Sequence, residues 1–168
     1  MIRLRHQLPD EVRTAAVGPG EKALAGAVTA DGRVVVGTRD ALYVDAQRIP
    51  WEIVERADWD KDEATLTVSE VGSWGRERPA HALPLEEPGR LLELVRERVT
   101  ASIVLQRHVP IHGKRGVIVI GRRAPRGHQP VEWVYEFDEG VDPDDPEVRR
   151  RAEVALAAAR DEVGPGAH

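Results

Sequence analysis

The stretch that decides the fold is residues 31–54, DGRVVVGTRDALYVDAQRIPWEIV. Asp31 and Gly32 form a two-residue turn signal between apolar runs, which predicts a β-hairpin. Its first strand is expected within residues 22–30. Its second is expected at 33–37, where three consecutive valines are typical of a β-strand. This part of the chain therefore predicts antiparallel β-structure.

The rest of the stretch predicts two further short strands. Residues 41–44 follow a polar corner and are apolar or aromatic. Pro50 has no backbone N–H to give to a ladder, so the strand around it is predicted at the edge of a sheet or at a kink.

A second hairpin is predicted outward from this stretch, with its turn at residues 60–63. In the strand that follows, apolar Leu66 and Val68 alternate with polar residues, the pattern of a half-buried antiparallel strand. Residues 81–85 predict one more short strand. Residues 88–107 predict a helix, because apolar side chains recur there at three- and four-residue spacing after a first-turn proline. Pro110 is expected to end that helix by Val109.

Two motifs in this region resemble the bacterial pleckstrin-homology-like family. Residues 38–44, TRDALYV, are similar to the family's threonine, arginine and short-strand segment, and residues 48–53, RIPWEI, to its turn into the next strand. The resemblance spans residues 22 to about 107. It implies a bent, seven-stranded sandwich or barrel capped by the helix. Members generally bind proteins or lipid headgroups and are not catalysts, so the resemblance implies an interaction module.

The C-terminal part predicts a ββα extension. Residues 117–120 are apolar on both faces, and residues 131–137 alternate with aromatic side chains on one face. Residues 142–147 supply helix caps and a first-turn proline for a last helix that ends at Gly164. The sequence thus predicts an α+β protein with a β domain at 1–109, an extension at 110–164 packed on it, and a disordered tail at 165–168.

Composition excludes several classes of function. The 168 residues include no cysteine, which removes disulfides and thiolate chemistry. The spacing of His108 and His112 suits a helical metal pair, but Pro110 between them argues against one shared helical face. We therefore expect no metal, no cofactor and no catalytic residue. No signal peptide or membrane span is visible, which favours a cytoplasmic protein.

Charge is the one feature that suggests a binding surface. The formal net charge is −5, yet residues 96–126 hold eight basic residues and a single acid. The candidate contact residues lie in this segment and in two loops, residues 72–78 and 124–130. They are Trp74, Arg76, Arg78, Lys114, Arg115, Arg122, Arg123 and Arg126.

Three functions remain open from the sequence. A non-enzymatic interaction or adaptor module that binds another protein is favoured. The alternative is a phosphate or nucleic-acid binding protein that uses the basic segment, although the negative net charge opposes it. In the favoured case the basic residues contact a protein or pair with Glu147, Glu153 and Asp161 of the last helix. An enzyme of unrecognised family is the third.

Overall fold

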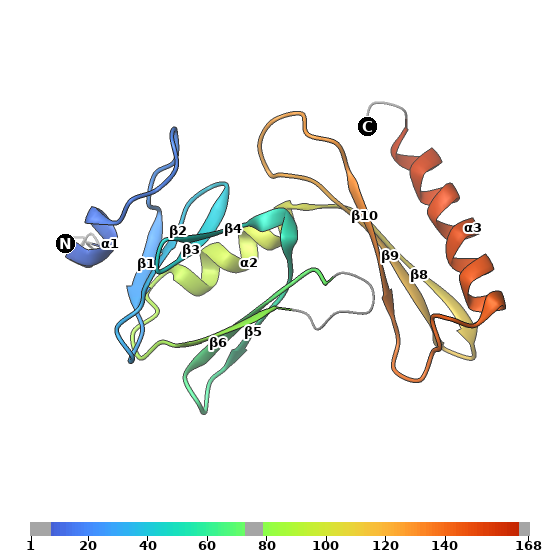
Figure 1. The fold of residues 1–168 in the computed structure, drawn as a ribbon, viewed down its shortest axis with the longest axis horizontal. Helices are drawn as coiled ribbons and strands as arrows, with labels where there is room; N and C mark the ends of the chain where they lie inside the picture. The colour runs from blue at the N-terminus through green and yellow to red at the C-terminus, as the bar shows by residue number, and fades with distance from the viewer. Residues whose placement is uncertain (1–7, 73–78, 165–168) are drawn as a thin grey trace, which may run out of the picture. The chain divides into compact units, whose positions relative to one another are not determined.

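The computed structural model describes residues 8–72 and 79–164, which form two compact units that meet in sequence between Ala101 and Ser102. The protein is α+β, with three antiparallel sheets and a C-terminal helix (Figure 1). Of the sandwich or barrel that the resemblance implies, the closed barrel is not observed, because the strands of the first unit form two separate sheets. The separation has a local cause at Pro50, after which a 3-10 turn interrupts the ladder before the next strand begins.

The first unit contains a four-stranded sheet, a three-stranded sheet and two helices. The four-stranded sheet has the order β1-β2-β3-β4 and the three-stranded sheet the order β5-β6-β7. The elements are α1 (Asp10–Thr14), β1 (Ala25–Val28), β2 (Val34–Gly37), β3 (Ala41–Val44), β4 (Gln47–Pro50), η1 (Trp51–Ile53), β5 (Val54–Asp60), β6 (Thr65–Glu70), β7 (Ala80–Pro84) and α2 (Leu91–Ala101).

Both predicted hairpins are confirmed. β1 and β2 pair across the Asp31-Gly32 turn, where the Thr29 N–H donates to the Arg33 carbonyl at 2.8 Å. β5 and β6 pair across residues 61–64, and the Asp60 carboxylate accepts two backbone N–H groups of that turn. Pro50 ends β4, an outer strand of its sheet, as its missing N–H requires.

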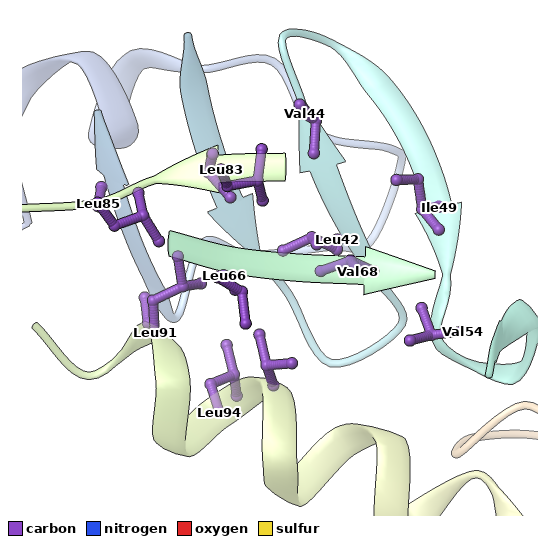
Figure 2. Packing of buried hydrophobic residues seen from close by; sticks show 14 of the residues in the cluster. Leu42, Val44, Ile49, Val54, Leu66, Val68, Leu83, Leu85, Leu91 and Leu94 are labelled. Carbon is purple, nitrogen blue, oxygen red and sulfur yellow. The ribbon is translucent and has the colours of Figure 1, made fainter. Parts of the chain in front are cut away.

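The main core lies between the two sheets and α2 (Figure 2). Leu42 and Ile49 of the first sheet and Leu66 and Leu83 of the second are almost fully buried. Three side chains of α2 at helical spacing contact this cluster, namely Leu91, Leu94 and Val95. The two sheets and the helix each bury an apolar face here, and these faces form the main core of the unit.

A second, smaller cluster covers the other face of the four-stranded sheet. Val12 of α1 is fully buried against Val36, Ala41 and Tyr43. Gly26 in β1 makes this possible, since a Cβ there would lie 2.6 Å from the Val12 side chain and 2.5 Å from the Val35 carbonyl oxygen. The helix α1 was not predicted from the sequence.

The predicted helix at 88–107 is only partly correct. α2 ends at Ala101, and β8 runs from Ile103 to His112. Ile103 and Leu105 continue the three- and four-residue apolar spacing of α2, and they also alternate as strand residues do. The pairing of β8 with β9 makes this segment a strand. Pro110 does not end a helix. It lies in an outer strand, where its missing N–H is tolerated.

The second unit is therefore βββα and not ββα, and it begins at Ser102 and not at residue 110. Its sheet has the order β10-β9-β8, with β9 at Arg115–Arg122 and β10 at Glu132–Phe137. The predicted aromatic face is confirmed: Trp133, Tyr135 and Phe137 pair with Gly121, Val119 and Val117 of the central strand.

The last helix, α3 (Pro146–Val163), is confirmed with its predicted signals. The Asp145 carboxylate caps the first turn by accepting the N–H groups of Glu147 and Val148, and Pro146 occupies the first position. Its small buried residues Ala152 and Ala159 lie on the face that contains Val148. α3 packs on β8 and β9.

Candidate functional site

β1 is an outer strand with backbone groups that point away from its sheet. The hydrogen bond from Thr29 to Arg33 shows that odd-numbered residues of β1 bond to β2. Since alternate residues of a strand face opposite edges, the N–H and C=O groups of Gly26 and Val28 point outward. Within the described residues, no hydrogen bond reaches these groups. The next outward donor, Ala30 N–H, already bonds to the Pro84 carbonyl of β7 at 2.9 Å, so the unpaired part of this edge is limited to Gly26 and Val28.

The sequence of β1 sets it apart from the other outer strands. Natural edges are protected against pairing by prolines and charged side chains. Ala25–Val28 has neither, and Val28 is 36% exposed. Each of the other five described outer strands has a proline, a charged side chain or both. They are β4 with Arg48 and Pro50, β5 with Glu55, Arg56 and Asp58, β7 with Pro84, β8 with Arg107 and Pro110, and β10 with Glu132 and Glu136.

A hollow of about 230 Å³ lies between the start of β1 and α2. Its apolar part consists of Leu24, Ala25 and Leu94, and Leu24 is 40% exposed. Arg90, which directly precedes α2, and Glu93 and Glu97 of α2 complete the lining. Pockets for small-molecule ligands are typically about 300–1,000 Å³. The hollow is smaller than that, and its size suits one or two side chains.

The hollow owes its position to the close approach of α2 to the four-stranded sheet. A Cβ on Gly37 of β2 would lie 2.5 Å from a methyl carbon of Leu94, so glycine at this position lets the helix pack against the strand. Leu94 thereby contributes to the core and to the hollow at once.

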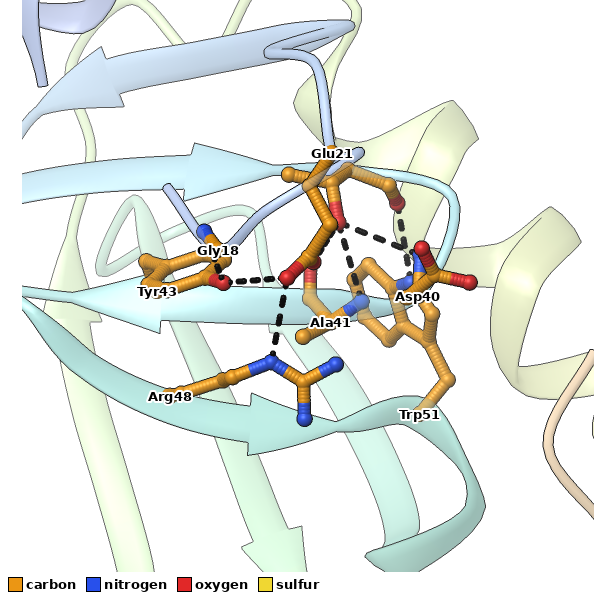
Figure 3. Close-up of polar contacts among 8 residues, drawn as sticks. Gly18, Glu21, Asp40, Ala41, Tyr43, Arg48 and Trp51 are labelled. Carbon is orange, nitrogen blue, oxygen red and sulfur yellow. Dashed lines mark hydrogen bonds and ion pairs between the residues drawn. The ribbon is translucent and has the colours of Figure 1, made fainter. Parts of the chain in front are cut away.

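A polar network holds the segment that leads into β1 (Figure 3). Both carboxylate oxygens of Glu21 accept hydrogen bonds, one from the Thr38 hydroxyl at 2.7 Å and the other from the Tyr43 hydroxyl at 2.6 Å. Arg48 Nε donates to the second oxygen at 3.2 Å. Tyr43 in turn accepts the Gly18 N–H at 2.8 Å. This carboxylate is buried and already accepts three hydrogen bonds from its own chain, so we assign the network a structural role.

The environment of the network shifts the pKa values of Glu21 and Tyr43 in opposite directions. Burial by itself raises the pKa of Glu21, but the hydrogen bonds from Tyr43, Thr38 and Arg48 outweigh it and hold the pKa below its ordinary value. Burial and the bond to Glu21 raise the pKa of Tyr43. Glu21 therefore stays ionised and Tyr43 stays neutral at physiological pH.

The motif behind the family resemblance lies in the same network. The Thr38 hydroxyl accepts the N–H groups of Asp40 and Ala41, each at 3.1 Å, and the Thr38 carbonyl accepts Trp51 Nε1–H at 2.9 Å. The motif residues thus close the β2–β3 corner. Glu21 was not predicted as part of a site, because its only signal in the sequence is an acid beside a glycine-rich turn.

In the second unit a histidine and an aspartate meet at one end of the sheet. His108 Nε2 lies 2.8 Å from Asp138 Oδ2, and the Gly116 N–H donates to the same oxygen at 2.8 Å. These two bonds hold the pKa of Asp138 below its ordinary value. The described residues include no group of three or more potential metal ligands around this pair or elsewhere.

The structure separates the predicted basic contact residues. Lys114 and Arg115 lie at the β8–β9 turn, whereas Arg122, Arg123 and Arg126 lie at or beyond the other end of β9. Eight strand residues at roughly 3.3 Å each place these ends about 23 Å apart. Arg122 is 2% exposed, so its prediction as a surface contact is wrong. Trp74, Arg76 and Arg78 lie outside the described residues.

The predicted ion pairs between the basic segment and α3 take a different form. Glu147 pairs with Arg150 and Arg151 of its own helix. An ion pair between the basic segment and α3 joins Arg107 to Glu162, a pair that was not predicted from the sequence.

Comparison with known proteins finds no matching family model, no matching curated protein and no matching solved structure. In the described part of the chain, no helix has both the length and the apolar character needed to span a membrane.

Proposed function

We propose that this chain is a non-enzymatic protein-interaction module that binds an extended segment of a partner protein along the edge of β1. The supporting observation is the bare edge itself. β1 presents the outward backbone groups of Gly26 and Val28 without a proline or a charge, next to a hollow of side-chain size. In β-strand addition, main-chain hydrogen bonds of this kind give affinity, and pockets for alternate side chains give specificity.

A pleckstrin-homology-like fold for the first unit is part of the same proposal. Two observations support this fold. The unit has antiparallel sheets of four and three strands, and the helix α2 follows them in sequence and packs on their shared core. The corner formed by Thr38, Ala41 and Trp51 supports it as well, because it involves the residues on which the resemblance rests.

The alternative of phosphate or nucleic-acid binding has weaker support. A phosphate-binding surface needs several basic side chains within reach of neighbouring phosphates. The five basic candidates of the second unit instead lie at two ends of one strand, and Arg122 is buried.

The experiment that tests the proposed function is selection of random twelve-residue peptides displayed on phage against the full chain. An enriched peptide is synthesised and bound to the isotope-labelled protein. We expect amide chemical shifts at residues 24–30 to change and the exchange of the Gly26 and Val28 amide protons to slow, because their N–H groups become hydrogen bonded. Enriched peptides that map to other residues would contradict the proposal.

A pair of variants isolates the backbone contribution. Val28→Pro removes one outward N–H and leaves the ladder to β2 intact, since that N–H is not part of the ladder. Val28→Thr keeps the N–H and is β-branched, so it is the matched control. Peptide binding should be lost in Val28→Pro and kept in Val28→Thr, with both variants showing the wild-type circular dichroism spectrum.

A further inference from the structure

We infer that the segment bound at β1 contains a lysine or arginine whose side chain occupies the hollow beside α2. This inference rests on the proposed function and specifies the chemistry of the partner. It follows from the lining of the hollow and from the direction of side chains in a strand added to β1.

The lining matches an amphipathic cation. Leu24, Ala25 and Leu94 form an apolar surface, and Glu93 and Glu97 lie one helical turn apart on α2. Lysine and arginine combine a long apolar stem with a charged head, so the stem can cover the leucines while the head reaches the carboxylates.

The existing partners of these carboxylates leave them available for such a contact. Arg90, which also lines the hollow, lies 3.9 Å from Glu93, and both side chains are about three-quarters exposed. Arg98 donates to Glu97 at 2.7 Å, but it does not line the hollow. The exposed Arg90–Glu93 pair contributes little energy. Glu97 accepts the Arg98 bond at Oε1, and its side chain remains 62% exposed although that of Arg98 is only 19% exposed. The lining residues comprise two acids and one base.

The strand geometry identifies the position of the basic residue. Paired residues of neighbouring strands point to the same face of a sheet. Ala25 points to the core face and lines the hollow, so the added residue opposite Ala25 points there too. The residue opposite Val28 lies on the other face, beside an exposed valine, and is expected to be apolar.

A second copy of this chain does not meet these requirements. Residues 23–30, the part that would pair edge to edge, include no lysine or arginine. Such a dimer would also place two sets of Glu93 and Glu97 near one shared edge. The net charge of −5 likewise favours a basic partner.

The test compares peptide selection on three proteins from the same library. These are the wild type, a Glu93→Lys/Glu97→Lys variant, and an Asp62→Lys/Glu63→Lys control, which changes the net charge equally at the exposed β5–β6 turn. We expect the wild type and the control to enrich lysine or arginine at one position, and the Glu93→Lys/Glu97→Lys variant to enrich aspartate or glutamate there.

Synthetic peptides then measure the contribution of the charge. Replacing the basic residue of the wild-type peptide by glutamine should weaken binding roughly threefold to tenfold at low salt, and less at high salt. Replacing it by glutamate should restore binding to the Glu93→Lys/Glu97→Lys variant.

The outcomes separate the two proposals. Peptides that map to β1 but show no basic preference, or a basic preference that survives the Glu93→Lys/Glu97→Lys change, overturn the inference and leave strand addition standing. A basic preference that is lost equally in the Asp62→Lys/Glu63→Lys control reflects overall charge and also overturns the inference. Failure to enrich any peptide on the wild type, or enrichment that Val28→Pro does not abolish, overturns the proposed function and the inference together.

Discussion

Tyr43 donates its phenolic proton to Glu21 at 2.6 Å, across 22 residues of sequence. The bond joins the middle of β3 to the segment that leads into β1. Together with the Gly18 N–H, which donates to Tyr43, it fixes the path of the chain just before the proposed binding edge.

Tyr43→Phe should therefore destabilise the first unit. It removes a hydrogen bond to a charged acceptor, worth about 1.5–3 kcal/mol, and leaves the Gly18 N–H without its acceptor. Tyr135→Phe is the control, because no side-chain hydrogen bond of Tyr135 occurs among the described residues. Urea denaturation followed by circular dichroism measures both variants. Equal stability of the two would show that the Tyr43–Glu21 bond contributes nothing net.

Acid should destabilise the protein partly through Glu21. Its folded-state pKa lies below the ordinary value of 4.5, so its stabilising contribution is present above that value and is lost as the pH falls through the folded pKa. Glu21→Gln should lower stability near pH 7 and flatten the decline between about pH 5 and about pH 3. Urea titrations across this range test the expectation, which an unchanged slope in Glu21→Gln would contradict.

Gly26→Ala should destabilise the packing of α1 on β1. The new methyl group would lie 2.5 Å from the Val35 carbonyl oxygen and 2.6 Å from Val12, so the expected cost is about 1–3 kcal/mol. Adding Val12→Ala removes only the side-chain clash and should not restore stability. Thermal melts of the single and double variants provide the measurement. A Gly26→Ala protein as stable as the wild type would contradict the close approach of both Val12 and the Val35 carbonyl oxygen to this position.

Nucleic acid should bind negligibly at physiological salt, since the basic candidates do not form one surface. Fluorescence anisotropy with labelled single- and double-stranded oligonucleotides tests this at low and physiological salt. Lys114→Ala/Arg115→Ala and Arg123→Ala/Arg126→Ala each remove two basic side chains, one pair at each end of β9. Submicromolar binding that persists at physiological salt and is lost in either variant would favour the alternative function.

The packing of the C-terminal part on the first unit stays a prediction from the sequence. Limited proteolysis decides it at the boundary that the structure defines, between Ala101 and Ser102. We expect no pair of stable fragments separated there. If two such fragments accumulate and each keeps its secondary structure, the units are independent domains.

Local signals predicted much of the secondary structure. The Asp31-Gly32 turn, the alternation around Leu66 and the caps at Asp145 and Gly164 all depend on residues within a few positions of one another. Turn and cap preferences arise from local backbone conformation and local hydrogen bonds, so they can be recognised in a single sequence.

The strand β8 shows where local signals fail. Residues 102–107 continue the apolar spacing of α2, and nothing local marks the break after Ala101. Pairing with β9 supplies the ladder that makes Ile103–His112 a strand, and that partner is distant in sequence. A proline that breaks a helix and a proline that occupies a sheet edge look identical until the neighbouring strand is known.

The sequence by itself determined the antiparallel hairpins, the aromatic face of β10 and the limits of α3, because each depends on period, turn chemistry or caps. Only the tertiary structure decided that β1 is an outer strand, that Glu21 meets Tyr43, and that Arg122 is buried while the other basic candidates lie at two ends of β9. Edge position, burial and charge clustering are relations between distant segments. They arise from which strands pair and which faces pack, and a pattern of neighbouring residues does not encode them.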